Sequence, residues 1–157
     1  MMKIKMGKIT ILIILIFLIG LIYGCSSSNV TGNANKDTKV TVFKSPSCGC
    51  CVGYIAELER NGFDVEIVET TDMTSIKQRY GIPRNMESCH TTVMGDYFVE
   101  GHVPIEAVEK LLEEKPDING IALPNMPAGS PGMPGIKRMP FRIYSLSNGQ
   151  VSEFATI

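Results

Sequence analysis

The sequence lacks the short motifs by which several large enzyme classes are recognised. It contains no glycine-rich loop of the kind that cradles phosphate groups, no G-x-S-x-G pattern and no H-E-x-x-H pattern. These absences speak against a P-loop nucleotide site, an α/β-hydrolase nucleophile and a zincin-type metalloprotease. The sequence also has no internal repeat.

The sequence also lacks the excess of basic residues that nucleic-acid-binding proteins carry. Its 15 Lys and Arg residues are balanced by 16 Asp and Glu residues, which gives a formal net charge of −1. Three lysines lie in the N-terminal segment, so residues 25–157 alone carry a formal charge of −4. No basic patch remains for a phosphate backbone, and we predict no nucleic-acid partner.

The long hydrophobic run near the N-terminus lacks the length of a membrane-spanning helix. It extends from Ile9 to Ile22, which is fewer than the roughly 20 residues that a spanning helix requires. Lysines precede the run and Gly24-Cys25 follows it, which is the pattern of a secretory signal peptide. Cleavage before Cys25 would resemble that of bacterial lipoproteins, with a lipid on the new N-terminal cysteine. The alternative is an uncleaved N-terminal anchor.

We therefore predict three segments along the chain. They are a lipoprotein-type signal peptide over residues 1–24, a flexible tether over 25–38 and a folded domain over 39–157. The tether is small and polar and has no hydrophobic periodicity. Either form of the N-terminus places the domain outside the cytoplasmic membrane, on the periplasmic or cell-surface side.

Hydrophobic periodicity in the domain alternates between the period of strands and that of helices. It predicts strands over 39–43 and 63–70, two more strands within 91–101, and helices over 50–62, 71–83 and 103–116. Strands separated by helices indicate an α/β fold, and this order matches a thioredoxin-like mixed sheet flanked by helices. Residues 122–135 form a Pro/Gly/Met-rich loop, and 141–157 form a hairpin that turns at Asn148-Gly149. We expect this C-terminal extension to extend or cover the sheet.

A cluster of three cysteines stands at the predicted start of the first helix, at Cys48, Cys50 and Cys51. The N-terminus of a helix stabilises thiolates. Adjacent cysteines pair only through a strained ring, so at most one unstrained disulfide forms inside the cluster, between Cys48 and Cys51. Thiol–disulfide exchange needs only an attacking and a resolving thiol, and a third thiol is better explained as a metal ligand. Soft thiolates favour one or more Cu(I) ions, with zinc as the main competitor.

Cys89 and His90 form a second group, directly before the predicted third strand. In the thioredoxin-like order, the loop before this strand faces the N-terminus of the first helix and usually carries a cis-proline. Here Cys89 and His90 would instead add a fourth thiol and an imidazole to the cluster. The alternative for His90 is a hydrogen-bonded loop histidine.

Three further side chains are weaker candidates for metal ligands. His102 follows two short strands and precedes a helix, where a capping or surface role is the alternative. Met126 and Met133 lie in the Pro/Gly/Met-rich loop and outside any helical spacing. They could be thioether ligands, or the loop could be only a covering flap.

Together, the segments SPSCGCC, SCHT, EGHVP and MPAGSPGM resemble the CopG-like copper-resistance family, whose members were formerly grouped as a domain of unknown function. The resemblance covers about residues 39–157. It implies an exported protein of thioredoxin-like fold that binds Cu(I) through Cys48, Cys50 and Cys51, with help from Cys89. It also implies an interconversion of Cu(I) and Cu(II), a role proposed for the family. The lipoprotein-type start departs from the plain secretion signal that is more usual there.

These observations predict an extracytoplasmic Cu(I)-binding protein of copper resistance, anchored to the membrane through Cys25. The predicted ligands are Cys48, Cys50, Cys51, Cys89, His90, His102, Met126 and Met133. Its partners would be copper ions and other extracytoplasmic copper-handling proteins. Two alternatives remain open: a thiol–disulfide oxidoreductase that attacks with Cys48 and resolves with Cys51, and a zinc or mercury scavenger without a redox role.

Overall fold

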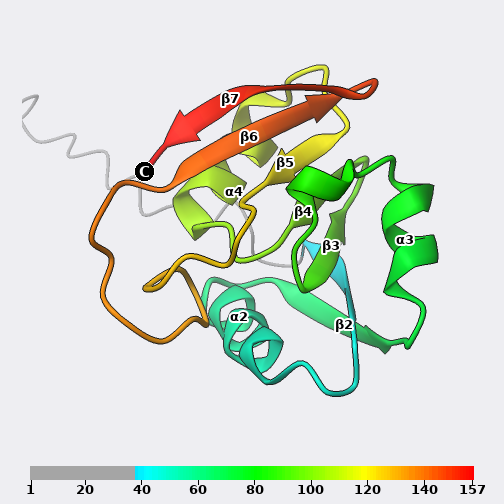
Figure 1. The fold of residues 1–157 in the computed structure, drawn as a ribbon, viewed down its shortest axis with the longest axis vertical. Helices are drawn as coiled ribbons and strands as arrows, with labels where there is room; N and C mark the ends of the chain where they lie inside the picture. The colour runs from blue at the N-terminus through cyan, green and yellow to red at the C-terminus, as the bar shows by residue number, and fades with distance from the viewer. Residues whose placement is uncertain (1–37) are drawn as a thin grey trace, which may run out of the picture. The chain divides into compact units, whose positions relative to one another are not determined.

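The computed structural model describes residues 38–157. The predicted signal peptide, Cys25 and the tether up to residue 37 lie outside the described residues. No helix within the described range has the length and hydrophobicity that crossing a membrane requires. The elements, labelled as in Figure 1, are β1 (Lys39–Lys44), α2 (Gly49–Arg60), β2 (Asp64–Glu69), α3 (Met73–Arg79), the 3₁₀ helix η1 (Arg84–Met86), β3 (His90–Met94), β4 (Tyr97–Glu100), α4 (Ile105–Glu114), β5 (Gly120–Ala122), β6 (Arg142–Ser147) and β7 (Gln150–Thr156).

One mixed sheet joins all seven of these strands, in the order β2-β1-β3-β4-β5-β6-β7. β1 pairs with β2 in parallel and β4 pairs with β5 in parallel, whereas the remaining neighbours are antiparallel. The predicted α/β class, with a mixed sheet flanked by helices, is confirmed. The closer description as thioredoxin-like stays a prediction.

Helices cover the two faces of the sheet. Successive strand residues point to opposite faces, so neighbouring residues of one strand pack in different cores. On one face, Val99 of β4 packs in the main core with Leu58 of α2 and Leu111 of α4. On the other face, its neighbour Phe98 packs in a smaller core with Met86 of η1. α2 therefore lies on the same side of the sheet as α4, and its first turn is held at the end of β1.

The C-terminal extension continues the sheet, which is one of the two outcomes that we expected, extending the sheet or covering it. β6 and β7 form the expected hairpin, in which Ser147 pairs with Gln150 around the turn at Asn148-Gly149. Sequence patterns did not predict β5, which has only three residues and connects the hairpin to β4. The long connection from β5 to β6 runs back toward α2 (Figure 1).

Candidate metal centre

A tight turn after β1 places the cysteine cluster at the start of α2. The Cys48 N–H donates to the Ser45 carbonyl at 3.0 Å, and Cys48 is the N-cap residue of the helix. Cys50 and Cys51 therefore lie in its first turn, where free backbone N–H groups and the helix dipole favour negative charge. The first turn contains no acidic residue that would oppose this effect. The local structure thus suits thiolates and metal ions bound by them.

Cys48 and Cys51 form a disulfide, with their Cα atoms 5.6 Å apart. This is the single unstrained bridge that the sequence allows inside the cluster. Cys50 and Cys89 are the free cysteines of the described residues, and both are half-buried. The structure is therefore the oxidised form of the Cys48–Cys51 pair, and two further thiols lie next to that disulfide.

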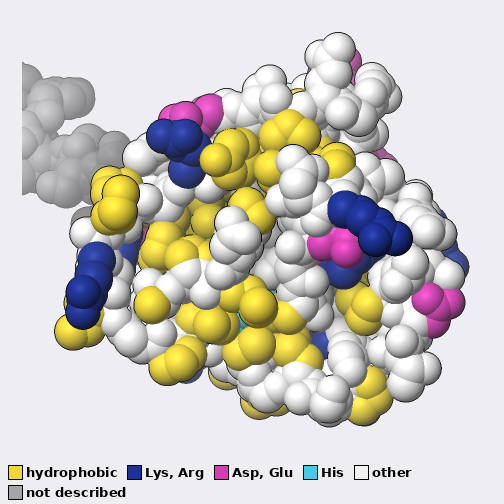
Figure 2. Space-filling view, in the orientation of Figure 1, with side chains coloured by type: hydrophobic (Ala, Val, Ile, Leu, Met, Phe, Trp, Pro, Cys, Tyr) yellow, Lys and Arg dark blue, Asp and Glu magenta, His cyan; other side chains and the backbone are white. Residues whose placement is uncertain are grey.

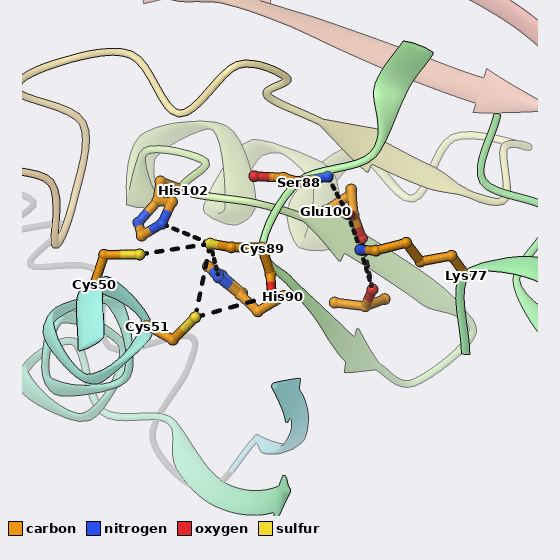
Figure 3. Close-up of polar contacts among 9 residues, drawn as sticks. Cys50, Cys51, Lys77, Ser88, Cys89, His90, Glu100 and His102 are labelled. Atoms are coloured by element: carbon orange, nitrogen blue, oxygen red, sulfur yellow. Dashed lines mark hydrogen bonds and ion pairs between the residues drawn. The ribbon is translucent and has the colours of Figure 1, made fainter. Parts of the chain in front are cut away.

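The Cys89 sulfur lies at the centre of the site (Figure 3). Its Sγ is 3.7 Å from Cys50 Sγ and 3.6 Å from Cys51 Sγ. On its other side, it is 3.3 Å from His90 Nδ1 and 3.0 Å from His102 Nε2. The expected approach of the loop before β3 to the start of α2 is therefore present, without any cis peptide bond in the described residues.

His102 is fully buried, which excludes the surface role considered from the sequence. Its Nδ1–H donates to the Pro131 carbonyl at 2.7 Å, because a carbonyl oxygen can only accept. In the neutral ring this leaves the lone pair on Nε2, the atom that faces Cys89. Burial lowers the pKa of His102 and so favours this neutral form. A backbone acceptor that orients a ligating histidine is typical of metal sites.

His90 is also fully buried and packs against two aromatic rings. Its ring centroid is 4.5 Å from that of Tyr54 and 4.8 Å from that of His102. Burial, together with the nearby His102 and Lys77, lowers the pKa of His90 to about 3. Its Nε2 has no hydrogen-bond partner within the described part of the chain. His90 is therefore a neutral imidazole at the start of β3, with Nδ1 next to Cys89 Sγ and Nε2 unpartnered.

Cys89 is held as a neutral thiol by its surroundings. Burial, followed by the charge of the nearby Cys50, raises the pKa of Cys89 to about 12. A metal ion that binds this sulfur has to displace its proton, so binding would release protons to solvent.

The side chains form two donor sets that share the Cys89 sulfur. The sulfur set consists of Cys48, Cys50, Cys51 and Cys89, and the mixed set of Cys89, His90 and His102. Within each set, one candidate ligand atom from every residue lies within 4.8 Å of all the others. Thiolate sulfur with imidazole nitrogen is a donor combination that suits copper and zinc and excludes hard cations such as Mg²⁺.

The β5–β6 loop packs directly against the cysteine turn. Gly132 approaches the backbone of α2 so closely that an added Cβ would lie 2.4 Å from Tyr54 N and 2.9 Å from the Cys50 carbonyl oxygen. The next residue toward the N-terminus, Pro131, supplies the carbonyl that orients His102. The sequence did not assign a role to Pro131, because its contribution is a backbone atom brought close by folding.

The two methionines of this loop are placed differently. Met126 is 39 % exposed, and Met133 is half-buried in a turn in which its N–H donates to the Ser130 carbonyl at 2.8 Å. Ligation by either thioether stays a prediction. Hydrophobic side chains gather over the region between α2 and this loop in Figure 2. Val52 of α2 is exposed, and so are Ile136 and Met139 of the loop.

Comparison with known proteins gives relatives of one kind. Residues 86–133 match a family model described as a protein of unknown function, DUF411. Two solved structures, forms 1 and 2 of "Copper resistance protein copG", are each 42% identical to the chain with a TM-score of 0.70. Each covers 76% of this chain, which in turn covers 96% of form 1 and 97% of form 2. No curated protein sequence matches the chain significantly.

Proposed function

The chain belongs to the CopG copper-resistance family, and from this premise we propose that it binds Cu(I) outside the cytoplasmic membrane as part of copper resistance. The observation that carries the proposal is the convergence of four cysteine sulfurs and two imidazoles around Cys89. Cuprous ion prefers soft thiolate ligands and accepts imidazole. Copper would be the cargo of this site, taken up and passed on.

The sulfur set would be the main Cu(I) site, and the two histidines would complete it. Cys50 and Cys89 are free, whereas Cys48 and Cys51 can ligate only after their disulfide is reduced by an external thiol reductant. Reduction would therefore raise the number of sulfur ligands from two to four. Bridging thiolates would allow more than one Cu(I) ion, and Met126 and Met133 are secondary candidates for thioether ligation.

A redox role follows from the same disulfide and would interconvert Cu(I) and Cu(II). If the reduced Cys48 and Cys51 thiols meet two Cu(II) ions, each ion takes one electron and becomes Cu(I). The two sulfurs lose these two electrons, form one disulfide bond and release two protons. One dithiol is thus matched to two copper ions, and the Cys48–Cys51 disulfide is the product of this step.

The predicted location and partners are further parts of the proposal. Residues 1–24 would direct export, and a lipid on Cys25 would hold the domain at the membrane. The exposed hydrophobic side chains beside the cysteine turn support transfer of copper to or from another extracytoplasmic copper-handling protein.

A thiol–disulfide oxidoreductase is the second candidate function, and the Cys48–Cys51 disulfide is the observation that favours it. In this reading Cys48 attacks a substrate disulfide and Cys51 resolves the mixed disulfide. Cys50 and Cys89 would compete with Cys51 for the mixed disulfide, because Cys50 Sγ lies 3.6 Å from Cys48 Sγ and 3.7 Å from Cys89 Sγ. Copper binding uses all four sulfurs and is therefore the better account.

An anaerobic titration tests the leading proposal. Fully reduced protein is titrated with Cu(I) in competition with a chromogenic chelator. The variant Cys48→Ser/Cys50→Ser/Cys51→Ser is titrated in the same way. We expect stoichiometric, high-affinity binding by the native sequence and its loss in the variant, because one cysteine and two imidazoles remain. A parallel titration with Cu(II) should consume two thiols for every two Cu(I) ions formed.

Three outcomes would count against this proposal. Stoichiometric Cu(I) binding that survives in the triple variant would show that the cluster is not the site. Insulin disulfide reduction that is lost in Cys48→Ser and kept in Cys50→Ser, without tight Cu(I) binding, would instead establish the oxidoreductase. Zinc competing equally with Cu(I) would point to a general soft-metal scavenger.

A further inference from the structure

Cys89 is the last residue of a short segment that follows η1 and has no helix or strand hydrogen bonds of its own. One contact that holds the backbone of this segment comes from the end of β4. There the Ser88 N–H donates to Oε1 of Glu100 at 2.5 Å (Figure 3). Ser88 directly precedes Cys89, whose sulfur belongs to both donor sets. A single hydrogen bond thus links the Glu100 carboxylate to the residue that precedes Cys89.

Glu100 is fully buried and its charge is balanced locally. It forms an ion pair with Lys77 of α3, and it accepts a hydrogen bond from the Thr91 hydroxyl at 2.6 Å. Lys77, which is itself only 5 % exposed, also donates to Thr91 Oγ1 at 3.4 Å. Burial raises the pKa of the Glu100 carboxyl, and the Lys77 ammonium opposes that rise. Three donors therefore surround a carboxylate that has no contact with solvent.

The stability of the fold does not explain why such a group is buried. Replacing a buried ion pair with apolar residues of similar size is often neutral or stabilising, because two charges no longer have to be desolvated. An apolar residue at position 100 could not, however, accept the hydrogen bond of the Ser88 N–H. What the carboxylate adds beyond packing is the position of Ser88.

The two residues that follow Glu100 support the same segment. Gly101, with φ of 79°, leaves room for Ser88, because an added Cβ would lie 2.5 Å from Ser88 Oγ. The Gly101 N–H donates to the His90 carbonyl at 3.1 Å. The segment Glu100–His102 thus holds the segment Ser88–His90 at successive positions and ends with the His102 contact to Cys89.

We propose that Glu100, with its charge balanced by Lys77, is a positioning residue of the copper site: it fixes Ser88 and thereby holds the Cys89 sulfur between the two donor sets. The consequence for copper rests on the proposed function. The anchoring of Ser88 does not, because it is a property of the protein without metal.

Two variants separate this role from a purely structural one. Glu100→Gln keeps Oε1 as the acceptor for Ser88 and presents an amide N–H to Thr91 Oγ1, but it removes the charge that balances Lys77. Lys77→Met/Thr91→Val/Glu100→Met makes the cluster apolar at similar volume, and only the Ser88 N–H loses its acceptor. The control is Lys39→Met/Glu66→Met, which removes an exposed ion pair of 3.2 Å between β1 and β2.

The two variants should give opposite results. For Glu100→Gln we expect a lower unfolding midpoint with Cu(I) affinity close to that of the native sequence. For the apolar triple variant we expect a midpoint near that of the native sequence and a Cu(I) affinity lower by about 10- to 100-fold, the usual effect of losing an outer-shell partner. In the protein without metal, hydrogen exchange of the Ser88 amide should accelerate in the triple variant alone. The control should change none of these quantities.

Several results would overturn the proposal. The first two are a native Cu(I) affinity and an unchanged hydrogen exchange of the Ser88 amide in the apolar triple variant. The third is failure of that variant to fold, which would make the cluster a stability element. A Cu(I) affinity that falls together with the unfolding midpoint in Glu100→Gln would also overturn the proposal. If the native sequence itself does not bind Cu(I), the proposed function fails, and the exchange of the Ser88 amide still decides whether Glu100 positions this segment.

Discussion

Among single residues, Tyr54 packs its ring against both imidazoles of the site. Its ring packs on His90 at 4.5 Å and meets His102 edge-on at 5.7 Å between centroids. The side chain is fully buried, and its hydroxyl has no hydrogen-bond partner within residues 38–157. The ring therefore supports the histidines, whereas the hydroxyl contributes an uncompensated burial cost.

Removing that hydroxyl should not weaken the protein. We expect Tyr54→Phe to leave the free energy of unfolding unchanged or to raise it by about 1 kcal/mol, because an unsatisfied buried polar group is lost. Tyr97→Phe is the matched control, since its hydroxyl donates to the Pro116 carbonyl at 2.9 Å and its loss should cost about 1 kcal/mol. Urea denaturation measures both. A clear loss of stability in Tyr54→Phe would mean that a buried water satisfies the hydroxyl.

The sequence identified the reactive side chains better than the groups that orient them. Cys48, Cys50 and Cys51 stand together in the sequence, and the strand–helix order suffices to bring Cys89 near them. Glu100 gave no such signal, because its role depends on distances between elements that no local pattern encodes. The same holds for the Pro131 carbonyl, since any residue supplies such an oxygen.

Among the elements, the β5–β6 loop packs directly against the site without supplying any of its cysteines or histidines. Its Gly132 rests on the first turn of α2, and its Pro131 carbonyl fixes the tautomer of His102. Gly132 has a φ of 78°, so its backbone conformation and its close approach both require glycine. The loop is thus a packed part of the site and more than a covering flap.

A side chain at position 132 should displace this loop. In Gly132→Ala the new Cβ would overlap the α2 backbone, and we expect a loss of more than about 1–2 kcal/mol of stability together with weaker Cu(I) binding. Gly149→Ala is the matched control, because it has a φ of 79° and open space around it. It should show the backbone strain alone and native Cu(I) affinity. Equal affinity in both variants, measured by chelator competition, would mean that the loop does not support His102.

Element prediction succeeded where the hydrophobic pattern was long and regular. The strands and helices up to residue 116 were predicted in the correct order, because each has several periodic residues and clear end signals. Asp72 is the N-cap of α3, and its side chain accepts the Ser75 N–H at 3.0 Å. β5 escaped prediction because three residues between Asn119 and Leu123 show no periodicity, and its strand state depends on pairing with β4 and β6.

The whole described domain shares one main core, and the C-terminal extension is part of it. Ile143 of β6 is fully buried in the same cluster as Val42 of β1 and Leu58 of α2. Phe141 closes the extension by exchanging two backbone hydrogen bonds with Ile157, at 2.7 and 2.9 Å. Because the β5–β6 loop is anchored by β6, the core that stabilises the sheet also holds Pro131 at the candidate metal centre.

A core substitution in the extension should therefore affect the entire domain. Ile143→Ala removes buried methyl groups and should lower the free energy of unfolding by about 2–5 kcal/mol, in one cooperative transition. Val151→Ala on β7 is the control, since that side chain is 37 % exposed and its loss should cost less than about 0.5 kcal/mol. The measurement is urea denaturation followed both by circular dichroism and by the exchange of the Ser88 amide. If the extension were an independent unit, Ile143→Ala would produce an early transition confined to residues after 140 and leave the Ser88 amide protected. A common midpoint for both probes would show that the core built by β6 stabilises the candidate metal centre.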